Sequence, residues 1–194
     1  MTDKLSRSDI VRVAVGLLST GGLHALAMRR IAAELGVQQS ALYWHFDSKQ
    51  QLIAAVADEL LVPVQAPDEG DWASRVTVLA ERLRAQLLDY PDGAELVATA
   101  IAFRLGAQRP FGQFTTELVG AGLAPERAEV AASVLVHFIL GYTTDEQQHR
   151  QAAALGAIDE ADGGGGSLSA EERFSQGIGL IVAGVEGTSR LPTR

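Results

Sequence analysis

The segment from Ala27 to Lys49 constrains the fold more than any other, because its pattern is typical of two short helices that cross at a tight turn. Ile31 and Leu35 lie four residues apart and therefore share one face of the first helix. Gly36 follows at once, and glycine adopts the left-handed conformation that ends a helix without steric cost. The pattern therefore predicts a helix that stops at Gly36 and a second helix that starts after Val37.

The second helix is predicted to run from about Gln39 to Phe46, with Leu42 and Phe46 facing inward onto the first helix. The run Tyr43-Trp44-His45 is unusual for a helix face that contacts only solvent. Glutamine pairs with adenine, small residues admit thymine methyl groups, and Tyr, Trp and His donate to phosphates, so this face suits a major groove. With a neighbouring arginine and the lysine that starts the next helix, the predicted DNA-contact set is Arg29, Gln38, Gln39, Ser40, Ala41, Tyr43, Trp44, His45 and Lys49.

These residues resemble the helix-turn-helix of the tetracycline-repressor (TetR) family of bacterial transcription regulators. The resemblance rests on the spacing from Ile31 to Leu42 and on the run Ala41–Phe46, which Ser48 and Lys49 follow. It implies an all-α fold, with an N-terminal three-helix helix-turn-helix domain and a C-terminal helical domain for ligand binding and dimerisation. From the residues alone, the alternative interpretation is a protein-binding helix-turn-helix or an ordinary hairpin of the core.

Charge is distributed unevenly along the 194 residues. The formal net charge is −8, yet residues 1–50 hold six Lys and Arg against four Asp and Glu, a balance of +2, so the remainder carries −10. A basic tip attracts phosphates while an acidic body repels them, which limits non-specific binding to DNA. Because +2 is modest, we expect the affinity to depend on dimerisation and on well-placed hydrogen bonds.

Several function classes are excluded or disfavoured by composition. The chain has no cysteine, which removes disulfides, thiolate catalysis and cysteine-ligated zinc. Its four histidines are scattered, without a recognisable nucleophile and base beside them, so we expect no enzymatic activity. The first residues lack the apolar core of a signal peptide, and the longest apolar runs fall short of a membrane span. We therefore expect a soluble, cytoplasmic protein with no membrane contact.

Helical spacing of apolar residues continues along the chain. Ser6 and Asp9 form a capping-box pattern before the first helix, which a Gly-Gly pair ends. Arg7 and Arg12 on this helix are interpreted as solvated charges, with phosphate contact as the alternative. Later helices are predicted over residues 49–62, 71–90, 94–103, 110–121, 125–154 and 170–189.

The domain boundary is predicted at Phe46. It gives a helix-turn-helix DNA-binding domain over residues 1–46 and a regulatory domain over residues 47–194, with the helix after Phe46 as the connector. Residues 155–169, which include Gly163 to Gly166, are expected to form a flexible loop. A phosphate-binding role for these glycines lacks the lysine that it needs.

The last two predicted helices are rich in apolar and small residues. Residues 131–142 are nearly apolar all round, and a helix without a polar face must be covered on several sides. On the last helix, Gly177, Gly184 and Gly187 permit a close approach. We therefore expect a homodimer held by a four-helix bundle across a two-fold axis, with packing wholly within one subunit as the alternative.

One polar cluster in the regulatory region is a candidate site. His137, Asp145 and His149 are eight and four residues apart and lie roughly on one face of a long helix. They suit a metal ion, a hydrogen bond to a ligand, or plain solvent contact. Nearby, Glu146 and Arg150 have the spacing of a surface ion pair.

The resemblance extends over nearly the whole chain, through LLDYPDGAELV, AGLAPERA and the run from His137 to His149. It implies a small-molecule pocket walled by the middle helices and by the dimer partner, and an effector that tilts the helix after the DNA-binding domain. Where tetracycline-binding members carry a magnesium-ligating histidine, this chain has Val97, which has no ligand atom. We therefore predict a largely apolar effector, bound without metal or cofactor. The predicted effector set is Leu83, Val97, Ile101, Phe103, Phe111, Phe114, His137, Tyr142 and Asp145.

Together these features predict a ligand-responsive repressor. It would bind a palindromic, double-stranded DNA operator as a homodimer and leave it when a small effector binds. Two alternatives remain: an activator or ligand-independent DNA binder, and a small-molecule carrier whose helix-turn-helix has lost DNA binding. Substituting Gln39 and Tyr43 separates the carrier from the others, because only a DNA binder loses occupancy.

Overall fold

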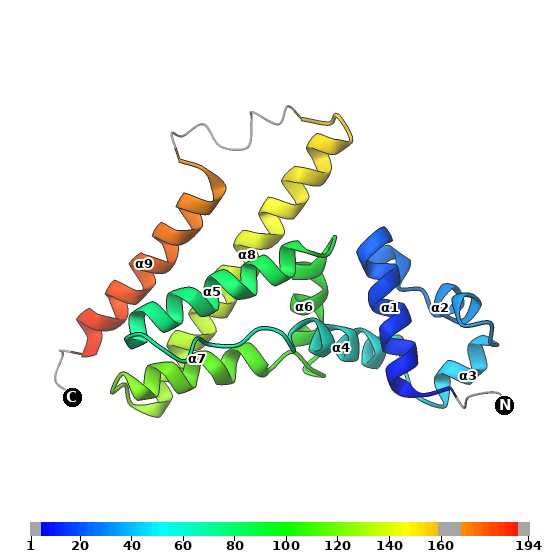
Figure 1. Ribbon diagram of the computed structural model, residues 1–194, viewed down its shortest axis with the longest axis horizontal. Helices are drawn as coiled ribbons and strands as arrows, with labels where there is room; N and C mark the ends of the chain where they lie inside the picture. Colours follow the sequence, from blue (N-terminus) through cyan, green and yellow to red (C-terminus); the bar gives the residue numbers. More distant parts are fainter. Residues whose placement is uncertain (1–4, 159–167, 190–194) are drawn as a thin grey trace. The chain divides into compact units, whose positions relative to one another are not determined.

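The computed structural model describes residues 5–158 and 168–189. Its helices, labelled in Figure 1 where there is room, are α1 (Arg7–Gly21), the 3-10 turn η1 (Leu23–Ala25), α2 (Met28–Glu34), α3 (Gln39–Tyr43), α4 (Lys49–Leu60), α5 (Trp72–Leu88), α6 (Gly93–Ala102), α7 (Arg109–Gly120), α8 (Pro125–Ala154) and α9 (Ala170–Ser189). These ranges contain no strand, so the predicted all-α fold is confirmed. Among the described helices, none has the length and apolar run that a membrane span requires.

The chain divides into two compact units. The first combines Met1–Pro63 with Gln86–Ala107, and the second combines Val64–Ala85 with Gln108–Arg194. In the first unit, helices α1 to α4 share one apolar core. Its fully buried members include Ile10, Leu18, Ile31, Leu42, Phe46, Leu52 and Val56.

The first helix begins as its sequence predicts. The Ser6 amide donates to Asp9 Oδ2 at 3.1 Å, and the Asp9 amide donates to Ser6 Oγ at 3.2 Å. This reciprocal pair satisfies two amides that a helix start leaves without a partner. The capping box therefore fixes the first turn of α1.

The turn between α2 and α3 also has the predicted geometry. The Val37 amide donates to the Ala32 carbonyl at 3.0 Å, and the Gly36 amide donates to the Ala33 carbonyl at 3.1 Å. This pair of bonds is the Schellman motif, which requires a left-handed residue after the helix. Gly36 has a φ of 66°, and an added Cβ there would meet nothing within 4 Å. Glycine is thus needed at Gly36 for its backbone conformation rather than for space.

The second helix of the motif is shorter than predicted. We expected it to reach Phe46, but α3 ends at Tyr43. The amides of His45 and Phe46 both donate to the Leu42 carbonyl, each at 3.0 Å. The helix therefore ends in a tight turn at these residues. Phe46 is still fully buried, as predicted. The later predicted helices agree with the structure to within two residues at each end, and those over 125–154 and 170–189 have the predicted bounds.

Two carboxylates explain why α6 belongs to the first unit. Asp92, at the N-cap of α6, accepts a hydrogen bond from the Leu23 amide at 2.9 Å. Asp58 of α4 accepts one from the Ala107 amide at 2.7 Å. Asp92 and Ala107 are separated by α6, so the two bonds tie both ends of that helix to α4 and to the turn after α1.

The second unit packs α7 along α8, and α9 against α8. Phe138 and Tyr142 of α8 form an aromatic cluster with Phe174 of α9, with ring centroids 5.6 to 5.7 Å apart. A Cβ on Gly177 would lie 2.3 Å from Phe138 Cζ, so this glycine permits a close approach within the chain itself. Gly184 and Gly187, by contrast, have nothing within 4 Å of an added Cβ.

The predicted ion pair of Glu146 and Arg150 on α8 forms, but it is not a plain surface pair, because Glu146 is buried. Its carboxylate accepts hydrogen bonds from Arg84 of α5 at 2.7 Å and from Arg150. The Arg84 guanidinium also lies over the Phe174 ring, 5.1 Å from its centroid. Glu146 therefore links α5, α8 and, through Arg84, α9.

The predicted loop over residues 155–169 lies only partly in the described structure. Residues 155–158 form a turn after α8, and Gly156 has a φ of 69°. Gly163 to Gly166 lie outside the described residues.

Candidate DNA-binding surface and effector region

Helix α3 has one face in the core and one face in solvent. Leu42, and Phe46 just after the helix, have no exposed surface. On the other side, Trp44 is 89% exposed and Tyr43 is 45% exposed. The rest of the predicted contact residues near α3 are exposed, except Ala41 and His45, which are half-buried. The structure therefore presents the predicted polar and aromatic face outward.

Two side chains of this face lie one helical turn apart and contact each other. Gln39 Nε2 donates to the Tyr43 hydroxyl at 3.5 Å, at the long end of hydrogen-bond distances. Such a pair keeps both side chains on the same stripe of the helix. The amide and the hydroxyl both remain available for base edges and phosphates, because each has further donor or acceptor capacity.

Two exposed cations flank α3. Arg29 lies on α2, and Lys49 is the first residue of α4. Within the described part of the chain, neither has an ion-pair partner. Ser48 caps α4 by accepting a hydrogen bond from the Gln51 amide at 3.2 Å. The positive end of a helix dipole and an ammonium group at Lys49 together favour a phosphate oxygen.

Arg7 is a residue whose role the sequence pattern missed. It is exposed, as the interpretation as a solvated charge requires, but in addition its Nη1 donates to the His45 carbonyl at 3.2 Å, and its Cζ lies 4.3 Å from the centroid of the Phe46 ring. Arg12, five residues later, has an ion pair with its near neighbour Asp9 and with no other residue of the described part of the chain. Because Arg7 and His45 are 38 residues apart, helical periodicity carries no signal of their contact.

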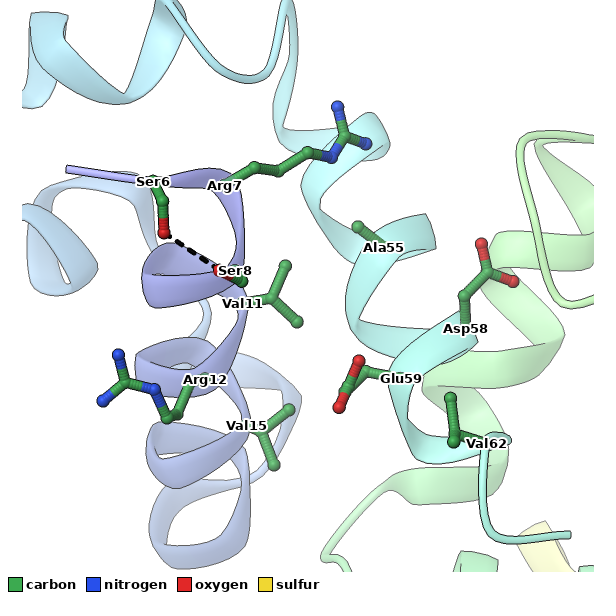
Figure 2. A pocket seen from close by; sticks show the side chains of 10 residues that line it. All are labelled: Ser6, Arg7, Ser8, Val11, Arg12, Val15, Ala55, Asp58, Glu59 and Val62. Carbon is green, nitrogen blue, oxygen red and sulfur yellow. Dashed lines mark hydrogen bonds between the residues drawn. The ribbon is translucent and has the colours of Figure 1, made fainter. Parts of the chain in front are cut away.

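A surface groove of about 860 Å³ runs between α1 and α4. Figure 2 shows Val11 and Val15 of α1 facing Ala55 and Glu59 of α4 across it. None of the predicted effector residues lines this groove.

The apolar members of the predicted effector set fall into two groups. Val97, Ile101 and Phe103 belong to the first unit, and Leu83, Phe111 and Phe114 belong to the second. Burial also differs among them, since Leu83, Val97 and Phe114 are buried whereas Phe103 is 44% exposed.

The polar members of the set lie on α8 and have different surroundings. His137 is exposed, with Nδ1 2.7 Å from the Ser133 carbonyl oxygen, and its ring meets Phe111 edge to face at 6.0 Å. Asp145 is exposed. The Tyr142 hydroxyl donates to the Ala170 carbonyl at 2.8 Å, so this side chain is engaged by the start of α9.

The predicted polar cluster does not form a metal site in the described structure. No three His, Cys, Asp or Glu side chains within residues 5–158 and 168–189 lie close enough to hold a metal ion. His149 Nε2 is buried and has no hydrogen-bond partner among the described residues. The predicted effector set does not include His149.

Comparison with known proteins places this geometry in a family. Residues 10–56 match the model of bacterial regulatory proteins of the tetR family, and residues 63–162 match that of the tetracyclin repressor-like C-terminal domain. The class C tetracycline repressor protein of Escherichia coli is 30% identical over 202 residues, which cover 95% of this chain and 92% of the relative.

Solved structures agree over nearly the whole chain. BioQ of Mycobacterium smegmatis is 32% identical with a TM-score of 0.85, covering 95% of this chain and 99% of BioQ. BioQ with its double-stranded DNA operator is 31% identical with a TM-score of 0.78 and the same coverage. A TetR variant from Acinetobacter baumannii AYE in complex with minocycline is 29% identical with a TM-score of 0.75, covering 97% of this chain and all of that chain. The chain therefore belongs to the tetR family of bacterial transcription regulators, with a tetracyclin repressor-like C-terminal domain.

Proposed function

We propose that this regulator is a repressor that binds a palindromic, double-stranded DNA operator and is released by a small effector. The observation that carries the proposal is the division of α3 into a buried face and an exposed one. Leu42 is fully buried, whereas Gln39 and Tyr43 on the helix and Trp44 directly after it are exposed. This arrangement can enter a major groove without disturbing the core. The operator complex of the similar BioQ supports the same use of the fold.

We propose that residues 1–46 form the DNA-binding domain and residues 47–194 the regulatory domain, with α4 as the connector. The buried Phe46 closes the helix-turn-helix core, and α4 begins at Lys49. A regulator of this kind acts where its DNA is, so we place it in the cytoplasm. Its proposed activity is binding and involves no catalysis.

Two copies of the chain are required for a palindromic operator. Support for a homodimer comes from apolar side chains left exposed on the last two helices. Val130 and Val134 on α8 are 65% and 49% exposed, and Leu180 on α9 is 76% exposed. Surface of this kind on adjoining helices is typical of an interface. Gly184 and Gly187, which have open space beside them, allow a partner helix to approach closely.

The proposed effector is a largely apolar molecule that binds without a divalent metal. At the position that the family resemblance aligns with a magnesium ligand, Val97 is buried and offers only hydrocarbon. An apolar ligand gains affinity from buried area, and one polar group suffices to orient it. His137 and Asp145 are exposed candidates for that contact, whereas the hydroxyl of Tyr142 already bonds to α9.

DNA binding is tested by selecting duplexes from a random pool with the wild-type protein. The double variant Gln39→Ala, Tyr43→Ala should lose the selected duplex, because both side chains lie on the exposed face of α3. Glu81→Ala, an exposed change on α5, is the control and should bind normally. If the wild type selects no sequence, or the double variant binds as well as the wild type, the proposed function is wrong.

Effector chemistry is tested by titrating the protein with tetracycline, with and without Mg²⁺, while following the fluorescence of Trp44 and Trp72. We expect no tight binding in either condition, because Val97 cannot coordinate the metal. Tight, magnesium-dependent quenching together with release of the selected duplex would overturn the metal-free proposal.

A further inference from the structure

Arg7 contacts the segment that ends the recognition helix, although it lies at the start of α1. Its Nη1 donates to the His45 carbonyl at 3.2 Å, and its Cζ lies 4.3 Å from the Phe46 ring centroid. His45 and Phe46 are adjacent and follow α3 after Trp44, so one guanidinium meets both the backbone and a side chain there. Figure 2 shows the Arg7 side chain extending from α1 toward the segment that leads into α4.

The backbone that carries Arg7 is itself fixed. Ser6 and Asp9 form the reciprocal capping box on either side of it, with bonds of 3.1 and 3.2 Å. The core residues Ile10 and Ala14 then anchor α1 with no exposed surface. Arg7 therefore acts from a rigid base.

Helix α3 depends on contacts with the rest of its unit, such as those that Arg7 makes with His45 and Phe46. It has five residues, and one turn of helix is not stable by itself in water. Leu42 and Phe46 hold it to the core through apolar contacts, which are not directional. A hydrogen bond and a planar guanidinium stacked on a ring are directional, and lysine lacks the planar group.

We infer that Arg7 is a positioning residue, which sets the orientation of α3 and so the presentation of Gln39, Tyr43 and Trp44 to DNA. The inference rests on the proposed DNA-binding function. Arg7 acts through His45 and Phe46 rather than through a base. The competing role for the same exposed guanidinium is a direct phosphate contact.

The first arm of the test needs no DNA. Amide hydrogen exchange is measured in Arg7→Ala, Arg7→Lys and Arg12→Ala, and the His45 and Phe46 amides are compared with those of Leu135 and Ile139 in α8. Arg12→Ala is the matched control, because it removes an arginine of the same helix whose ion pair, among residues 5–158 and 168–189, is with Asp9. We expect Arg7→Ala to speed exchange at His45 and Phe46 about tenfold relative to α8, given the typical strength of a stacked cation and a charged hydrogen bond.

The second arm measures binding to the duplex selected by the wild type and to a shuffled duplex over a range of salt concentrations. Positioning predicts that Arg7→Ala lowers the ratio of specific to non-specific affinity about tenfold and leaves the slope of log affinity against log salt unchanged. A phosphate contact predicts a slope smaller by about one and an unchanged ratio. Arg7→Lys should restore neither the ratio nor the slow exchange.

The outcomes separate the inference from the function on which it rests. Faster exchange at His45 and Phe46 with a reduced affinity ratio supports positioning. Unchanged relative exchange, a reduced salt slope, or full restoration by Arg7→Lys overturns it. If the wild type selects no duplex, the proposed function fails, and the exchange arm still decides whether Arg7 orders the end of α3.

Discussion

The DNA-contact set and the effector set differ in how their members are held. The DNA-contact residues lie between Arg29 and Lys49, within one compact unit, around a helix whose other face is fully buried. The effector residues extend from Leu83 to Asp145 and are divided between two units. The first set is therefore positioned by local geometry, through one turn and one core. The second depends on how several helices assemble, so its members range from fully buried to exposed.

The largest effect should come from the buried face of the recognition segment. Phe46→Ala should lower the free energy of unfolding by about 3 to 5 kcal/mol, because a fully buried ring leaves a cavity. Trp44→Ala, only two residues earlier but 89% exposed, should stay within about 0.5 kcal/mol. Urea unfolding of both variants measures the contrast. Equal losses would mean that residues 39–46 lack the distinct buried and exposed sides on which the DNA-binding proposal depends.

A similar contrast is expected in the second unit, between neighbouring carboxylates of α8. Glu146→Ala should cost about 3 kcal/mol, because it leaves the largely buried Arg84 without its partner. Asp145→Ala removes an exposed carboxylate and should cost less than about 0.5 kcal/mol. Thermal unfolding of the two variants distinguishes them. If both are equally mild, the Arg84–Glu146 pair does not hold α5 to α8.

Next in size are the two kinds of contact expected within the DNA-contact set. Gln39→Ala should weaken operator binding by about 1 to 3 kcal/mol and relax the preference at one base pair per half-site. Lys49→Ala should weaken binding to all sequences alike and reduce the salt slope by about one. Binding of both variants to a panel of altered duplexes provides the measurement. Identical behaviour across the panel would contradict the division between base contact and phosphate contact.

The smallest effect concerns the loss of stability at low pH when Asp71, which caps the start of α5, is protonated. Asp71 accepts a hydrogen bond from the Ser74 amide at 2.8 Å, which holds the pKa of Asp71 below its usual value. A lowered pKa means that the stabilisation is present above the unfolded-state pKa and is lost as pH falls through the folded-state pKa, below about pH 4. Asp71→Asn keeps a good N-cap without this titration, so it should flatten the acid dependence of unfolding. Equal slopes below pH 4 for the two proteins would contradict the assignment.

The local features of the fold were predictable, because each depends on residues close in sequence. The capping box of Ser6 and Asp9 and the left-handed turn at Gly36 are examples. The end of α3 could not be predicted. There the Leu42 carbonyl accepts hydrogen bonds from both His45 and Phe46, and this depends on the burial of Phe46 in the core. The spacing of apolar residues along the sequence says little about helix ends that tertiary packing determines.

Polar contacts between residues far apart in the chain could not be predicted from the sequence either, because they also depend on tertiary packing. Arg7 and His45 are 38 residues apart, and Arg84 and Glu146 are 62 apart. Arg7 was interpreted as a solvated charge and Arg84 was not singled out, because nothing nearby in the chain identifies their partners. The residues of the effector set are also far apart in the sequence, so the set remains a prediction. The exposed residues around α3 are close in sequence and could be described one by one.

The most direct test of the account is a hydroxyl-radical footprint of the wild-type protein on its selected duplex. Two equivalent protected regions related by a two-fold axis are expected, with half-sites about one helical turn apart, because paired α3 helices must enter successive major grooves. A footprint that lacks two-fold symmetry would contradict the central claim that two copies of α3 read the operator.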